Sequence, residues 1–162
     1  MLLLRYVALL ALVVWVGGLV ALGAVAAPAT FDVMAVRHVA EGRLLAGAVF
    51  GEVLRRFFYV TCGAAAVAFL SLAARRVLGP KPRHGGIRAA ILLLMTAAML
   101  YAGIVVAARI EALQATMTVA PSSLAETDPR RVEFGRLHGI SSALQLVPLI
   151  GGLALIFWEL KE

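Results

Sequence analysis

The sequence predicts an all-α integral membrane protein, a four-helix bundle that forms one domain over residues 1–162. Three observations support this. The chain is 62% apolar and only 15% charged, it contains long runs without a formally charged side chain, and short charged connectors separate them. The runs are 6–27, 57–74, 89–108 and 137–158. As helices they reach roughly 27–33 Å, the thickness of a bilayer core. They are apolar nearly all round, whereas a water-soluble bundle would carry a polar stripe on each helix.

The first run is expected to be a retained membrane span that ends at Pro28. It is longer than the roughly 7–15 apolar residues of a secretory signal peptide, although residues 24–26 are similar to a cleavage site. Pro28 lacks a backbone N–H and predicts the end of the helix. Thr30 then predicts the start of a short outer segment that reaches Gly42.

The second run is expected to begin outside the membrane. From Leu44 the pattern is already helical, with Glu52, Arg55 and Arg56 on one side of the wheel and apolar residues on the other. No helix breaker separates this amphipathic stretch from the span. The sequence therefore predicts one helix of about 35 residues, from Leu44 to Leu78, that extends beyond the outer membrane face.

The fourth run is also expected to extend beyond the outer face. Asp128 is a good N-cap and Pro129 suits the first helical position, so the helix is predicted to run from there to Trp158. Pro148 lies inside it and predicts a kink. Residues 112–127, between the third and fourth helices, form the longest predicted loop.

The basic residues predict the orientation. The connector between the second and third runs contains five basic residues and no acid: Arg75, Arg76, Lys81, Arg83 and Arg88. Such a connector is typical of the cytoplasmic side, which places both termini in the cytoplasm. The net charge of +6 thus reflects membrane topology, and no nucleic-acid partner is expected. Composition rich in Ala, Arg, Gly and Leu suggests a bacterial plasma (inner) membrane.

Small residues at four-residue spacing mark expected helix contacts, because spans in lipid associate through close backbone approach. They are Gly47 and Gly51, Ala64 and Ala68, and Gly135, Gly139 and Ala143. They could pack within one bundle, or they could form a seam with another copy of the chain.

One polar constellation is a candidate functional cluster. Arg131, His138 and Gln145 recur every seven residues on the fourth helix, and Ser141 and Ser142 fall close to the same face. Charged residues from the outer ends of the helices, the charged crown, complete the cluster: Glu52, Arg55, Arg109, Glu111, Arg131 and Arg136. In one interpretation these residues form ion pairs and His138 locks the bundle. In the other, the crown binds an anion or a metal, or His138 transfers protons.

The sequence indicates neither a cofactor nor a metal site. Cys62 is a single cysteine, and of the three histidines only His38 and His138 could meet. No zinc, haem or catalytic-triad pattern is present, so a non-enzymatic protein is expected. The large aromatic residues are expected to be interfacial anchors. They are Tyr6, Trp15, Tyr59, Tyr101 and Trp158.

A set of short strings resembles a known family. Trp15 to Gly18, Ala27-Pro28 with Phe31, Ala46-Gly47 with Gly51, and Phe134 to Ser141 together resemble the bacterial domain-of-unknown-function family 4149. That family is related to a eukaryotic transmembrane-protein group associated with platinum-drug tolerance. The resemblance implies a compact four-span protein of unestablished biochemistry. It also implies that His138 and Ser141 are the most distinctive polar residues, followed by Arg109 and Arg136.

Two functions are therefore expected. The first is an accessory or structural subunit that acts through partners: the lipid bilayer, and either other membrane protein subunits or further copies of itself. The second is a small transporter or export factor for an ion or metal species, which would use the charged crown and His138.

Overall fold

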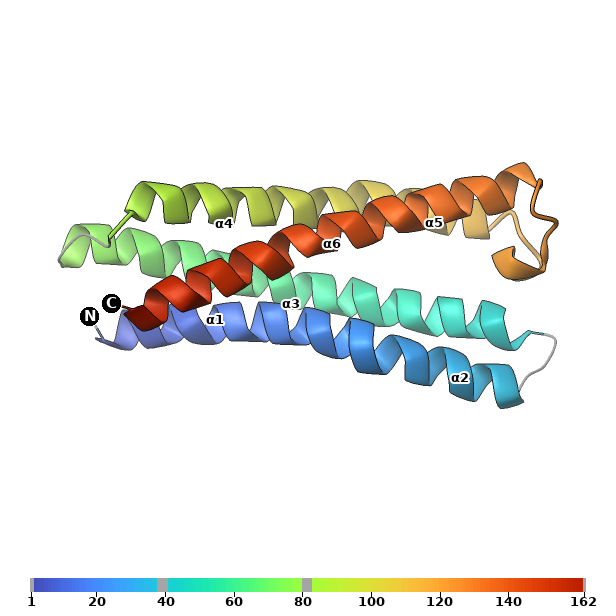
Figure 1. Cartoon of the computed structure of the whole chain (residues 1–162), viewed down its shortest axis with the longest axis horizontal. Coiled ribbons are helices and arrows are strands. Elements are labelled where there is room, and N and C mark those ends of the chain that lie inside the picture. The colour runs from blue at the N-terminus through green and yellow to red at the C-terminus, as the bar shows by residue number, and fades with distance from the viewer. Residues whose placement is uncertain (1, 38–40, 80–82, 162) are drawn as a thin grey trace.

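The computed structural model describes residues 2–37, 41–79 and 83–161, and nearly all of them are helical. In chain order the elements are α1 (Leu2–Ala21), η1 (Leu22–Ala26), α2 (Ala27–Arg37), α3 (Gly42–Leu78), α4 (Gly85–Leu100), η2 (Tyr101–Val106), α5 (Ala107–Gln114), η3 (Pro121–Ser123) and α6 (Pro129–Lys161). The elements α1, η1 and α2 form one continuous rod, and α4, η2 and α5 form another (Figure 1).

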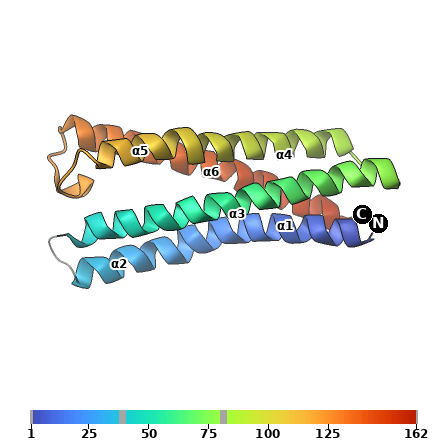
Figure 2. The ribbon, with the colours of Figure 1, turned by 180° about the vertical axis from the view of Figure 1, so that it is seen from behind.

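The described residues form four helical rods that are long and apolar enough to cross a membrane. They are Leu2–Val36, Gly42–Leu78, Gly85–Gln114 and Pro129–Lys161. This confirms the predicted multi-pass helical membrane protein. Both chain termini lie at one end of the bundle, which we call the terminal end (Figures 1 and 2). The opposite end, where α2, α3, α5 and α6 begin or stop, is the distal end.

The prediction that Pro28 ends the first helix is wrong. The rod passes through Pro28 and continues to Arg37. The reason lies in η1, a π-helical segment in which the Ala27 N–H donates to the carbonyl of Leu22. This wider turn loosens the backbone immediately before the proline, and such a bulge is a usual way for a helix to accommodate a ring that lacks an N–H.

The predicted end of α3 and start of α6 are confirmed, while the other ends of these helices differ from the prediction by two or three residues. α3 begins two residues before Leu44 and ends at Leu78, as expected from the unbroken pattern. α6 begins at Pro129, and the Arg130 N–H donates to Oδ1 of Asp128 at 2.9 Å, which is the expected N-cap. Hydrogen bonds from Arg130 also lower the pKa of the Asp128 carboxyl. α6 then continues through Pro148 to Lys161.

The apolar core lies in the terminal half of the bundle. Trp15 is only 1% exposed, so the prediction that it anchors at the membrane surface is wrong. Its indole packs in a cluster that all four rods supply: Ala11, Leu12, Trp15, Ala64, Ala65, Ala68, Leu92, Met95 and Leu155. The predicted contact through Ala64 and Ala68 on α3 is thus confirmed.

Glycines bring the rods close together. The adjacent rings of Phe57 and Phe58 on α3 lie directly against Gly18 of α1 and Gly103 of η2. Val16 of α1 lies in the same way against Gly152 of α6. In each case a Cβ atom on the glycine would overlap the neighbouring side chain. The close approach supplies the dispersion contacts that hold helices together where lipid replaces water.

The path of α6 is oblique to the other rods. It contacts α1 at the terminal end and α4, η2 and α5 farther along (Figures 1 and 2). Its buried residues lie on the inward side: Leu137, Pro148, Gly152, Leu155 and Glu159. The opposite side of α6 is left uncovered by the rest of the described chain.

Candidate functional site

The polar residues of α6 do not all lie on one side of the helix. His138 and Ser142 are exposed, whereas Ser141 and Gln145 are half-buried. They lie within the predicted apolar run 137–158. Among the described residues, no hydrogen bond reaches any of these four side chains.

The threonines of the other rods behave differently. Thr30 donates to the carbonyl of Ala26, Thr61 to that of Phe58 and Thr96 to that of Leu92, at 2.7–2.8 Å. A hydroxyl bonded to its own helix is satisfied even when lipid surrounds it. The polar side chains of α6 have no such bond, so they are the groups of this bundle that gain most from an external partner.

His138 is held by an aromatic neighbour. Its ring stacks on Phe134, with centroids 6.1 Å apart and an interplanar angle of 8°. The nitrogens of imidazole lie in the ring plane, so stacking fixes the ring without using them. His138 can therefore donate or accept a hydrogen bond along its edge.

Two glycines lie beside these polar groups. A Cβ atom on Gly135 or Gly139 would meet nothing within 4 Å, and the same holds for Gly51 on α3. Only Gly47, of the four predicted packing glycines, lies near another rod: its Cβ position is 3.6 Å from Nε2 of Gln114. Packing within the described chain therefore does not use Gly51, Gly135 or Gly139, because α3 and α6 turn these residues outward. We call the outward surface of α6 formed by Gly135, His138, Gly139, Ser142 and Leu146 the α6 exposed face.

The charged crown does not come together as one site. Glu52 accepts hydrogen bonds from Arg55 at 2.7 and 2.9 Å and from Arg56 at 2.8 Å, all within α3. On α6, Arg136 contacts Glu133 at 3.4 Å. These are local pairs, as the structural interpretation of the sequence expected.

The remaining members of the crown are also separate. Arg131 donates to the carbonyl of Leu124 at 2.7 Å and lies 3.5 Å from Glu126. Arg109 and Glu111 are exposed on α5, and neither forms an ion pair with the described residues. His38, the other histidine that could meet His138, lies outside the described residues.

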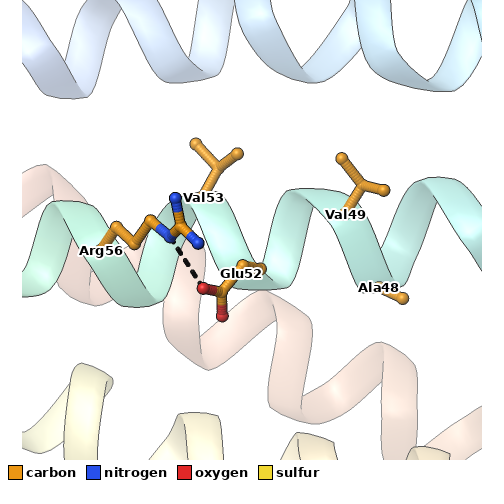
Figure 3. Close-up of a pocket in the computed structure, with 5 residues that line it drawn as sticks. All are labelled: Ala48, Val49, Glu52, Val53 and Arg56. Carbon is orange, nitrogen blue, oxygen red and sulfur yellow. Dashed lines mark hydrogen bonds and ion pairs between the residues drawn. The ribbon is translucent and has the colours of Figure 1, made fainter.

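A surface depression on α3 is open. Ala48, Val49, Glu52, Val53 and Arg56 line it, as Figure 3 shows, and all five belong to the same helix. No second element closes it, and its charged members already bind each other through the Glu52–Arg56 pair. A depression of this shape does not enclose a small molecule.

Replacing Glu52 by glutamine is expected to leave the melting temperature unchanged. The Glu52 pairs with Arg55 and Arg56 are exposed and lie within one helix, where water and salt screen the charges. Thermal unfolding of the purified protein in detergent, followed by circular dichroism, measures this. A clear loss of stability would mean that the α3 pairs support the bundle.

A second charged cluster, which the sequence did not predict, lies at the terminal end. Glu159 of α6 accepts hydrogen bonds from Nη1 of Arg75 at 2.7 and 2.8 Å and from Nη1 of Arg88 at 2.7 Å. Arg5 of α1 donates to the Glu159 carbonyl. Arg75, Arg88 and Glu159 are 4–8% exposed. Nε of Arg5 also lies 3.8 Å from the Glu159 carboxylate, so this one side chain contacts arginines of the three other rods. The cavity beside it, about 30 Å³, is too small for a ligand larger than water.

The cluster has a signal in the sequence. Glu159 directly follows the last apolar run, and Arg75 and Arg88 flank the basic connector at the same end of the bundle. An acid and two arginines at one predicted depth, on different helices, are candidates for a buried pair. In the sequence analysis these arginines are used only to predict which side of the membrane the connector lies on.

A metal site is not apparent in the described residues. No group of three or more histidine, cysteine, aspartate or glutamate side chains could hold an ion there. Cys62 is half-buried and forms no disulfide.

The fold and these sites define a multi-pass helical membrane protein. It has a buried charged cluster around Glu159 at the terminal end, and polar residues on the α6 exposed face. A family model described as a domain of unknown function (DUF4149) matches residues 10–119, so the chain belongs to this family. No curated protein matches the chain. No solved structure matches it either.

The family match covers part of the strings that carried the resemblance. It includes Trp15 to Gly18 and Ala46-Gly47 with Gly51, and it confirms the predicted family. It ends before Phe134 to Ser141, the segment that contains His138. The α6 exposed face is therefore a feature of this chain that the family match does not describe.

Proposed function

We propose that this protein is a non-enzymatic accessory subunit that docks onto another membrane protein through the α6 exposed face. One observation carries the proposal. His138 and Ser142 lie on an uncovered helix surface within an apolar run, and no hydrogen bond from the described residues reaches either side chain.

The polar side chains of this face are less stable against lipid hydrocarbon than against a second helix. A hydroxyl or imidazole that faces hydrocarbon loses its hydrogen bonds with water and gains none in return. Against a second helix the same groups can bond across the interface, with about 0.6–2 kcal/mol for each bond. Gly135 and Gly139 allow that helix to approach closely, because nothing lies within 4 Å of their Cβ positions.

Three finer expectations accompany this proposal. The basic connector supports cytoplasmic termini, which would make the distal end the outer end and let α3 and α6 extend beyond the outer membrane face. The composition supports a bacterial inner membrane. Membership of the family supports kinship with the eukaryotic group associated with platinum-drug tolerance, to which the resemblance relates the family.

Transport of an ion or metal species is the other expected function, and no specific observation favours it. Transport through the crown would need polar side chains along one interior path. In the described chain Glu52 and Arg55 bind each other along α3, and His138 lies on the exposed side of α6.

Replacing His138 by alanine is expected to leave the protein inserted and its melting temperature unchanged, and to reduce association with its partner roughly three- to tenfold. This corresponds to the loss of one interhelical hydrogen bond. The measurement is the fraction of tagged full-length chain that migrates in a larger complex after mild solubilisation of its native membranes.

Thr96→Ala is the matched control. Its hydroxyl bonds to Leu92 on the same helix, so the complex should persist. If His138→Ala lowers only the melting temperature and leaves the complex intact, His138 has a structural role and the docking proposal is wrong.

A further inference from the structure

We infer that the partner of the α6 exposed face is a transmembrane helix of a different protein, with a carboxylate near the distal end, and not a second copy of this chain. The inference rests on the proposed docking function. It is carried by the charges that border the face.

Basic side chains border the face on both sides at its distal end. At 100° per residue, Arg136 falls on one side of the line through Gly135 and Gly139, while Arg131 and His138 fall on the other. Arg131 lies 3.5 Å from Glu126, an acid of the preceding loop whose side chain is 88% exposed. The acid nearest to these basic residues on the helix, Glu133, lies farther round the helix behind Arg136. Its contact with Arg136 is long, at 3.4 Å, and the Arg136 side chain is 71% exposed.

A second copy would meet the wrong charge. Copies of one chain enter the membrane in the same orientation, so a two-fold dimer through this face would be parallel. Arg131 and Arg136 of one copy would then lie at the same depth as their equivalents in the other. Like charges that face each other across an interface cost several kcal/mol and exclude a partner.

A carboxylate on the partner helix would instead be attracted to the basic side chains on both sides of the face. The Arg136 guanidinium has a planar set of donors that fits a carboxylate, and the His138 edge can add a further donor. The small residues between them let the partner's backbone come near enough for these short side-chain bonds. The recognised chemistry is thus an apolar helix with a small-residue surface and one aspartate or glutamate at its distal end.

Site-specific photocrosslinking in native membranes tests this inference. A photoreactive benzophenone amino acid replaces Leu146, an exposed apolar residue of the face, in the full-length chain. The matched control places it at Leu94, which is exposed on α4. Mass spectrometry then identifies the peptide attached to position 146. The expected adduct is an apolar helix of another protein with an acidic residue close to its distal end.

Charge reversal supplies the second measurement. Arg136→Glu is expected to reduce the adduct at position 146 at least tenfold, and Arg136→Gln less. Arg56→Glu changes an exposed arginine of α3 at the same end and should leave the yield unchanged. Circular dichroism and the melting temperature establish that each variant is folded.

The outcomes separate the inference from the proposed function. An adduct of twice the chain's mass shows a second copy and overturns the inference, while docking through α6 stands. A foreign helix without an acid, or a yield that Arg136→Glu does not change, also overturns it. No adduct at position 146 beyond that at position 94 overturns the proposed function itself.

Discussion

Replacing Glu159 by glutamine is expected to lower the free energy of unfolding by about 3–5 kcal/mol, the usual cost of removing one partner from a buried ion pair. Glu159 is 8% exposed and binds Arg75 and Arg88, which are equally buried. Glutamine keeps the size of the side chain but removes its negative charge. The buried guanidiniums would then lose the carboxylate that compensates them.

The expected structural consequence is a looser terminal end. Arg5, Arg75, Arg88 and Glu159 come from four different rods, and Glu159 forms polar contacts with the other three residues. The free energy can be obtained by titrating the protein from mild detergent into a denaturing one, with tryptophan fluorescence as the signal. Trp158 is suited to this because its ring lies 6.0 Å from the Arg88 guanidinium.

Glu133→Gln is the matched control for this prediction. Glu133 lies on the same helix, but its contact with Arg136 is long and exposed. Its removal should leave the unfolding curve unchanged. If Glu159→Gln behaves like Glu133→Gln, the cluster does not hold the rods together.

The spans could be predicted from the sequence because length and hydropathy depend only on the chain and the bilayer. Helices α3 and α6 illustrate this, since the end of α3 at Leu78 and the start of α6 at Pro129 follow from a breaker and a cap in the sequence. Which side of each helix faces inward could not be predicted in the same way. In lipid both sides of a span are apolar, so hydrophobic periodicity does not distinguish them.

Because the inward side of each helix could not be predicted, the roles of His138 and Glu159 could not be predicted either. His138 was expected to face protein or water, and within this chain it faces outward. The rotation of α6 depends on contacts that link distant parts of the chain, such as Val16 with Gly152. The importance of Glu159 depends in the same way on Arg75 and Arg88, which lie 84 and 71 residues away. Pairings over such distances cannot be obtained from one helix at a time.

Replacing Gly152 by alanine is expected to destabilise the bundle by about 1–3 kcal/mol, the usual cost of overpacking a core. The added Cβ would overlap Cγ2 of Val16, a residue that is 6% exposed. A valine on a helix has one strongly preferred rotamer, so it cannot turn away easily. The helices α1 and α6 would have to separate, and the contacts around Trp15 and Leu155 would weaken with them.

Two further variants make this result specific to the α1–α6 contact. Gly63→Ala on α3 meets nothing within 4 Å, so it should be neutral or stabilise the helix by up to about 1 kcal/mol. Val16→Ala removes the overlapping methyl groups. It should therefore cost less stability in the Gly152→Ala background than alone, which a double-mutant cycle measures. Two outcomes would contradict this prediction: the destabilising effects of the two substitutions are simply additive, or Gly152→Ala stabilises the protein as Gly63→Ala does. In either case α6 is not rotated about its axis as the structure has it, and the residues assigned to the α6 exposed face would not face outward.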